Sequence, residues 1–223
     1  MCFSAGASFG ASAVLSVIGV AVIKKADSPY QIPFASIPLI FSVQQFSEGF
    51  VWLSLSNPAF APMEKISTFT FLIFAQIIWP LFVPISITLL EKNVKRKNIL
   101  KIFIGVGILV AFYFAHRLLM YGVKPNIARL HVAYKQVHPD SLGHIADMLY
   151  GIATLAPTFL SKVKRMWAFG LLVAISYMIT FVFYSNNILS VWCFFASIIS
   201  ITIYVIVRGI VTNKNETREL VME

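Results

Sequence analysis

Long apolar segments separated by short polar links are the feature that most restricts how this chain can fold. A helix that crosses the hydrocarbon core of a bilayer needs about 20 mostly apolar residues, and the sequence offers seven such segments. They cover residues 3–23, 32–54, 66–90, 98–120, 142–160, 166–184 and 188–209. With 58% hydrophobic and only 12% charged residues, the composition excludes a soluble domain. The sequence therefore predicts an all-α integral membrane protein with seven transmembrane helices.

The basic residues are distributed unevenly between the links. Cytoplasmic loops of membrane proteins accumulate Lys and Arg near helix ends, and most of the 18 basic residues fall on one side of a seven-helix arrangement. That side holds Lys24, Lys25, Lys92, Lys95, Arg96, Lys97, Lys101, Lys162, Lys164, Arg165, Arg208, Lys214 and Arg218. The pattern predicts an N-terminus outside and a C-terminus in the cytoplasm, in a multi-pass protein of the plasma (inner) membrane.

The chain shows no Gly/Ser/Pro-rich linker between two cores and no evident repeat. This predicts one transmembrane domain over residues 1–210, followed by a polar cytoplasmic tail over residues 211–223. The net charge of +9 comes mostly from the basic residues that indicate the topology. These residues also attract the anionic headgroups of membrane lipids to some extent. Since no basic domain is present to grip a phosphate backbone, nucleic acid is not an expected partner.

Glu48 lies in the second apolar segment, where a carboxylate is costly and usually marks a functional site. Helical spacing places Gln44, Glu48 and Trp52 on one face, with Gln45 beside them. We expect this face to form part of a site. Glu48 is its catalytic candidate, and the two glutamines with Trp52 are its cofactor-binding candidates.

Other potential metal ligands share the outer half of the membrane with Glu48. Because a helix rises about 1.5 Å per residue, His116, His144 and Asp147 fall roughly 6 to 10 Å outward of the midplane. Cys2 lies near the outer rim. Imidazole, carboxylate and thiolate ligands favour zinc. The predicted metal site comprises Glu48, His116, His144, Asp147 and Cys2.

A structural interpretation of the same residues stays open. The ligands come from separate helices, and the sequence holds no compact motif such as His-Glu-x-x-His. In this second interpretation Glu48 is protonated, or paired with Arg117, within a hydrogen-bond network between helices.

The longest link between apolar segments covers residues 121–141. Its apolar residues Leu130, Val132, Tyr134 and Val137 indicate an extended segment, placed where it can cap a cavity. The link also holds His131 and His138. We expect these histidines to be solvated, which makes them poor ligand candidates unless the link folds inward.

Two motifs are distinctive: Met-Cys-Phe-Ser-Ala-x-Ala-Ser-Phe over residues 1–9 and Gln-Gln-x-x-Glu-Gly-x-x-Trp over residues 44–52. By these motifs the chain resembles a family of uncharacterised bacterial multi-pass membrane proteins, and the resemblance extends over the seven-helix region. It draws attention to Cys2, Gln44, Gln45 and Glu48 but implies no activity.

In helix number the chain is also similar to seven-helix hydrolases of the alkaline ceramidase and progestin-and-adipoQ receptor type, which hold zinc. It lacks their paired C-terminal His-x-x-x-His, so the activity is not carried over.

These observations predict a polar pocket in the outer leaflet, with three candidate functions. In a metal-dependent hydrolase, zinc-bound water attacks an amide or ester of a lipid that arrives from the outer leaflet. Glu48 is then a fourth ligand or the general base. In a sensor or binding protein, the pocket binds a metal or a small molecule without turnover. In a single-haem protein, His116 and His144 are the axial ligands.

Overall fold

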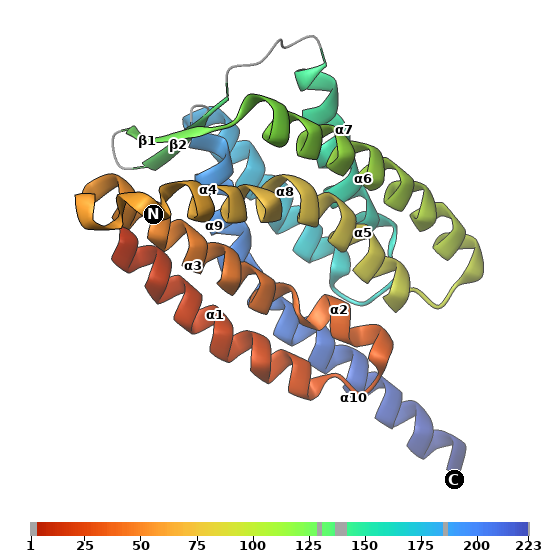
Figure 1. The fold of residues 1–223 in the computed structure, drawn as a ribbon. Helices are drawn as coiled ribbons and strands as arrows, with labels where there is room; N and C mark the ends of the chain where they lie inside the picture. The colour runs from red at the N-terminus through yellow and green to blue at the C-terminus, as the bar shows by residue number, and fades with distance from the viewer. Residues whose placement is uncertain (1–3, 129–130, 137–141, 185–186, 223) are drawn as a thin grey trace.

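The computed structural model describes residues 4–128, 131–136, 142–184 and 187–222, with side chains as far as Thr212 in the last helix. It is an elongated bundle of helices with a β-hairpin at one end (Figure 1). The helices are α1 (Ala5–Lys25), α2 (Ile32–Ala35), α3 (Ile37–Ser56), α4 (Glu64–Leu72), α5 (Trp79–Leu90), α6 (Val94–Tyr121), α7 (Gly143–Leu160), α8 (Met166–Phe183), α9 (Ile188–Ile199) and α10 (Thr202–Met222). Two 3₁₀ turns, Pro29–Gln31 and Pro58–Met63, and a π-helix, Ile73–Ile78, link some of them.

Five helical stretches are long and apolar enough to cross a membrane, which agrees with a helical, multi-pass membrane protein. They are Ala5–Lys25, Pro58–Leu90, Val94–Tyr121, Met166–Phe183 and Ile188–Thr212. Two further long helices, α3 and α7, carry the polar residues singled out in the sequence. Neither α3 nor α7 is among the five stretches.

Small residues let α1 pack closely on α3. The Ser42 hydroxyl of α3 donates to the Ser12 carbonyl at 2.9 Å, and Ser42 Oγ lies 2.6 Å from Ser16 Oγ. A Cβ atom added at Gly19 would lie 2.7 Å from the backbone nitrogen of Leu39. Such small-residue contacts are typical of helices that associate in membranes. They fix the position of α3, and with it Glu48, against α1.

The rod formed by α4 and α5 is interrupted by the π-helix at Ile73–Ile78. Pro80 follows in the first turn of α5, a position that tolerates proline. An irregular turn frees backbone carbonyls for other partners, and here the Tyr150 hydroxyl of α7 donates to the Ala75 carbonyl at 2.7 Å. The π-helix also holds Gln76, which is buried.

A hairpin of two antiparallel strands closes one end of the bundle, so the chain is not purely helical. Its strands are β1 (Lys124–Ala128) and β2 (His131–Lys135), with Ala128 opposite His131. Gly122 follows α6 with φ of +61°, a conformation that glycine adopts without steric cost. The extended segment expected in this link is therefore present over its described residues, whereas Leu130, Val137 and His138 lie outside them.

His131 corrects the expectation of a solvated side chain. It is only 7% exposed, and its ring packs edge-on against Tyr184 with centroids 5.0 Å apart. The reason is that β2 folds inward over α9, and Val132 of β2 joins an apolar cluster with Val51 and Trp52 of α3. Burial lowers the pKa of the His131 imidazole below its usual value.

The largest apolar cluster joins helices from both ends of the sequence. It contains Phe34 of α2, Trp79 of α5, Met166 of α8 and Ile203 of α10, all buried. This core fixes how the helices that carry the polar residues face one another.

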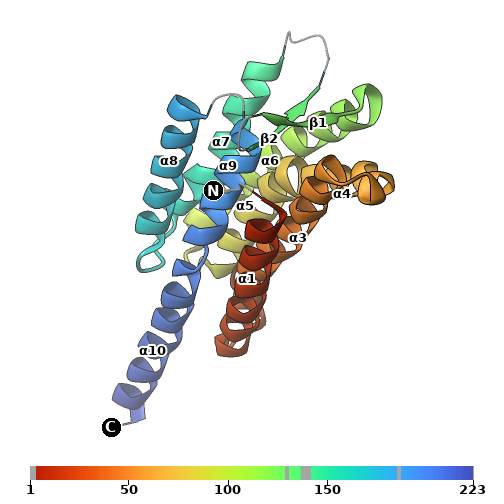
Figure 2. The same cartoon turned by 90° about the vertical axis from the view of Figure 1, so that its left-hand side faces the viewer.

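The last rod, α9 with α10, projects from the bundle at the end opposite the hairpin (Figures 1 and 2). The chain tightens where the two helices meet, since Ile201 N–H bonds to the Ile198 carbonyl at 3.1 Å and Ile203 N–H to the Ser200 carbonyl at 3.0 Å. α10 then continues to Met222, through the segment predicted as a polar tail. The start of α1 and the end of α10 lie toward opposite ends of the molecule (Figure 1).

Candidate functional site

Glu48 is fully buried where α3 meets α9. The Ser190 hydroxyl on α9 donates a hydrogen bond to Glu48 Oε1 at 2.5 Å. One turn earlier Gln44 and Gln45 are also fully buried, and one turn later Trp52 is 6% exposed. The polar face of α3 therefore points into the protein interior.

Gln44 connects three helices. Its Oε1 accepts a hydrogen bond from Trp79 Nε1 on α5 at 2.7 Å. Its side chain also lies close enough to the Cys193 thiol on α9 to interact with it. The indole of Trp79 stacks on Phe41 with ring centroids 4.0 Å apart. Gln44 thus serves as an interhelical hydrogen-bonding group in the middle of the bundle.

Gln45 and Trp52 differ from Gln44, because no polar atom of their side chains is hydrogen-bonded to a described residue, whereas Gln44 accepts a bond through Oε1. In the described part of the chain, neither Oε1 nor Nε2 of Gln45 makes a hydrogen bond, and Trp52 Nε1 makes none either. Buried polar groups without a protein partner are uncommon and are usually satisfied by water or a ligand. These two residues give the interior beside Glu48 an unused hydrogen-bonding capacity.

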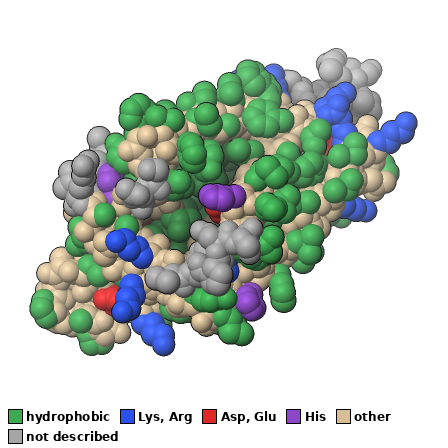
Figure 3. Space-filling view, turned by 90° about the horizontal axis from the view of Figure 1, so that it is seen from above, with side chains coloured by type: hydrophobic (Ala, Val, Ile, Leu, Met, Phe, Trp, Pro, Cys, Tyr) green, Lys and Arg blue, Asp and Glu red, His purple; other side chains and the backbone are tan. Residues whose placement is uncertain are grey.

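A cavity of about 310 Å³ opens at the hairpin end of the bundle. Its polar lining consists of Gln76, Arg117, Tyr134, Gln136, His144, Asp147, Tyr150 and Tyr177. Its apolar lining includes Leu72, Ala75, Phe114, Ile188, Leu189 and Trp192. Figure 3 views this end of the molecule, where a histidine and an acidic side chain lie at a hollow bordered by hydrophobic side chains. His144 and Asp147, expected on one face of a helix, thus share an open cavity.

Arg117 lies half-buried in the wall of this cavity. Its guanidinium lies 5.6 Å from the ring centre of Tyr113 and 5.5 Å from that of Phe114, and Nη2 donates to Gln136 Oε1 at 3.1 Å. Cation–π contacts of this kind stabilise a partly desolvated cation. The cavity therefore presents a guanidinium, an imidazole, a carboxylate and phenol hydroxyls to one space.

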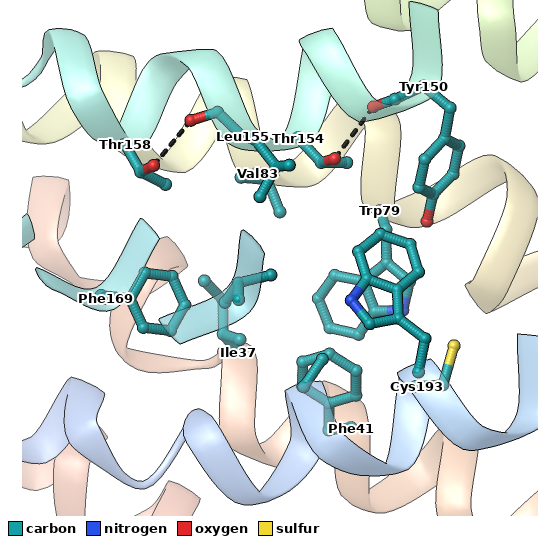
Figure 4. Close-up of a pocket in the computed structure, with 13 residues that line it drawn as sticks. Ile37, Phe41, Trp79, Val83, Tyr150, Thr154, Leu155, Thr158, Phe169 and Cys193 are labelled. Carbon is teal, nitrogen blue, oxygen red and sulfur yellow. Dashed lines mark hydrogen bonds between the residues drawn. The ribbon is translucent and has the colours of Figure 1, made fainter. Parts of the chain in front are cut away.

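A smaller pocket of about 60 Å³ lies farther from the hairpin and shares Tyr150 and Trp192 with the cavity. Figure 4 shows its walls, among them the stacked aromatic rings and two threonines of α7. The threonine hydroxyls turn back to their own helix, Thr154 to the Tyr150 carbonyl at 2.9 Å and Thr158 to the Leu155 carbonyl at 2.6 Å. The pocket surface is consequently apolar.

The structure separates the candidate residues into two regions. Ser190 of α9 contacts Glu48, whereas Leu189 and Trp192 of the same helix line the cavity. Among the described residues that line the cavity, none belongs to α3. The Glu48 cluster therefore lies behind the cavity wall formed by α9.

His116 belongs to neither region. Its side chain is exposed on α6, whereas the next residue, Arg117, lines the cavity. Successive residues of an α-helix point about 100° apart, so His116 and Arg117 face different surroundings. The same orientation separates His116 from His144, the pair considered for haem.

The five-ligand zinc site is not assembled by the described residues. Across them, no three His, Cys, Asp or Glu side chains come together in a geometry that would hold a metal ion. Cys2 lies outside the described residues. The expectation rested on shared depth, and depth does not determine which way each helix faces.

Ser190 and Tyr150 take part in these regions although the sequence did not single them out. A serine or a tyrosine in an apolar helix is common, so neither carries a signal of its own. Gln76 does carry a sequence signal, because an amide side chain in an apolar segment costs free energy unless it has a role.

Comparison with known proteins gives a family but no characterised relative. Neither the search of curated proteins nor that of solved structures gave a match. The family model spans both sequence motifs and all the residues of the two regions, in agreement with the expected uncharacterised family. Residues 1–218 match a family of unknown function, DUF6629, and the chain belongs to that family.

Proposed function

We propose that this protein crosses the plasma (inner) membrane with seven helical rods and binds a small amphiphilic molecule in the cavity at its outer end. The rods are α1, α2 with α3, α4 with α5, α6, α7, α8, and α9 with α10. The N-terminus is outside and the C-terminus cytoplasmic, because the basic residues gather at the links away from the hairpin.

The cavity itself is the observation that carries this proposal. Its volume, about 310 Å³, lies at the lower end of the range of small-molecule sites. Its walls combine aromatic rings with a few charged and hydrogen-bonding groups, which is the usual composition of such sites. Arg117, His144 and Asp147 suit a polar head with both donors and acceptors. The adjacent apolar pocket suits a short apolar part of the same molecule.

The membrane orientation can be tested by labelling with a membrane-impermeant maleimide. We expect Lys135→Cys, in β2, to react in intact cells, and Lys95→Cys, at the start of α6, to react only after the membrane is opened. Both positions are exposed, so a difference between them reports on their side of the membrane. A Cys2→Ser background leaves Cys193, which is buried. The reverse labelling pattern would place the cavity in the cytoplasm and refute the proposed orientation.

A metal-dependent hydrolase of lipid amides or esters is the second candidate. It is favoured by His144 and Asp147, which lie together in a cavity open to a lipid headgroup. Of the ligands expected for zinc, these two line the cavity, and Glu48 is behind α9. Binding without turnover requires no third ligand, and the geometry therefore supports it better than hydrolysis or haem binding.

The two predicted histidines offer a matched test of ligand binding. We expect His144→Ala to reduce the amount of co-purified amphiphile about tenfold, the effect of losing one hydrogen bond to a polar head. His116→Ala should leave it unchanged, because His116 is exposed and outside the cavity. The readout is organic extraction of each detergent-purified variant, followed by mass spectrometry with the yield expressed per protein.

Equal amounts of extracted molecules in both variants and in the unchanged protein would contradict the proposed site. Elemental analysis of the same samples separates the two candidate functions. Near-stoichiometric zinc that is lost in His144→Ala and retained in His116→Ala would favour the hydrolase.

A further inference from the structure

A second groove lies at the opposite end of the molecule, between the link that precedes α8 and the exposed side of α10. It encloses about 350 Å³, and its lining includes Lys164, Arg165 and Arg208 with Tyr204, Val205 and Thr212. All three cations are exposed. None of the described residues that line the groove is acidic, so the charge of its described lining is positive.

Glu91 contacts this link, but its carboxylate is engaged by backbone N–H groups. Glu91 accepts the backbone N–H groups of Lys92 and Asn93 through Oε1 and that of Lys162 through Oε2, each at 3.1 Å. It thereby joins the link before α8 to the link before α6. Its carboxylate does not line the groove, so it is not among the groups that surround the space between the three cations.

An apolar stripe leads along the last rod into this groove. Ile198, Ile201 and Val205 are 46%, 41% and 45% exposed and follow one another at spacings of three and four residues. The same spacing continues to Arg208 and Thr212, which line the groove. Val205, Arg208 and Thr212 at this spacing lie along one side of α10, and the exposed Ile198 and Ile201 precede them across the tightened turn between α9 and α10. A surface that is apolar along its length and cationic at its end matches a lipid chain attached to an anionic head.

We propose that this groove binds an anionic phospholipid, with the phosphate among Lys164, Arg165 and Arg208 and an acyl chain along the Ile198–Val205 stripe. Each basic side chain near an anionic membrane surface contributes to binding, and guanidinium groups match phosphate geometry well. A soluble phosphate would use the cations but not the stripe. On the topology proposed above, the groove lies in the cytoplasmic leaflet.

Trp167 provides a local probe for this site. It is 59% exposed and lies two residues after Arg165, whereas Trp52, Trp79 and Trp192 are 6%, 4% and 8% exposed. Lipids that carry bromine on their chains quench the fluorescence of the tryptophans they contact. In vesicles that contain the full-length protein, quenching will therefore come mainly from lipids beside Trp167. Trp167→Phe should remove it.

We expect the affinity of brominated phosphatidylglycerol for this site to be about tenfold higher than that of brominated phosphatidylcholine, whose headgroup has no net charge. This ratio of affinities is the headgroup preference of the site. Arg208→Gln should reduce the preference to about twofold. Lys95→Gln, which removes an exposed charge at the same end but outside the groove, should retain it. Arg208→Lys, which keeps the charge, should restore most of it.

Equal quenching by the two lipids would overturn the proposal, as would an unchanged preference in Arg208→Gln. Inorganic phosphate separates the two possible sources of the anion. If it displaces phosphatidylglycerol at similar concentrations, the groove is a site for soluble anions and the lipid assignment fails.

Discussion

Replacement of Gly107 by alanine is expected to cost about 3 kcal/mol of folding stability, the upper part of the range for overpacked interiors. Gly107 is the point where α6 lies against the start of α5. A Cβ atom there would lie 2.0 Å from the Pro80 carbonyl oxygen and 2.9 Å from its carbonyl carbon. Both are backbone atoms, which cannot rotate away as a flexible side chain can. The two helices must therefore separate.

Gly105 on the same helix is the matched control, because a Cβ atom there meets nothing within 4 Å. Gly105→Ala should be neutral or stabilising by up to about 1 kcal/mol, the helix-propensity difference between the two residues. The unfolding free energy of both variants can be compared by titration of the detergent-purified protein with a denaturing detergent. Similar stabilities for the two variants would show that α5 and α6 do not pack as closely as described.

Glu48→Ala is the second substitution with a large expected effect, because we expect it to lower the free energy of unfolding by about 3 kcal/mol. The change removes a fully buried side chain and leaves a cavity. It also deprives the Ser190 hydroxyl of the oxygen to which it donates at 2.5 Å. A buried hydrogen-bonding group left without its partner costs about 1–3 kcal/mol. Thermal unfolding of the purified variant in the same detergent measures the sum of both effects.

Glu48→Gln separates shape and hydrogen bonding from charge. Glutamine has nearly the same volume and keeps an oxygen that can accept from Ser190, so we expect a loss of about 1 kcal/mol or less. A loss as large as that of Glu48→Ala would mean that the negative charge itself stabilises the fold. If Glu48→Gln is stable but loses metal or activity, the catalytic interpretation of Glu48 would gain support over the structural one.

The Glu48–Ser190 contact also bears on the cavity. Ser190 faces α3, while Leu189 and Trp192 on the same helix face the cavity. A bond that fixes the rotation of α9 thereby fixes the cavity wall. If the cavity binds a ligand as proposed, Glu48 acts on that binding through the position of α9 and not through direct contact. Glu48→Ala should consequently weaken ligand retention even though Glu48 lies behind the wall.

Much of the architecture follows from one-dimensional properties of the chain. The length of an apolar segment predicts a helix, because backbone N–H and C=O groups in the hydrocarbon core must be hydrogen-bonded within the protein. The predicted segment at residues 98–120 lies within α6, and that at residues 166–184 matches α8 within a residue. Polar content singled out α3 and α7, and both helices carry residues of the two regions. The spacing of Gln44, Glu48 and Trp52 also indicated a common face, and all three are buried.

The tertiary structure alone decided which way each helix faces. His116 and Arg117 are neighbours in sequence and lie at nearly one depth, yet only Arg117 lines the cavity. His131 lies in a link where the sequence predicts solvated side chains, yet it is buried, because β2 folds inward over α9.

The sequence by itself determined the helical membrane architecture and the short list of polar residues, because both depend on local composition and helical period. The division of those residues between a buried Glu48 cluster and an open cavity was decided by tertiary packing. The rotation of each helix is set by contacts with distant segments, such as Gly107 on Pro80 and Ser42 on Ser12. No local pattern records these contacts, because each depends on two helices at once.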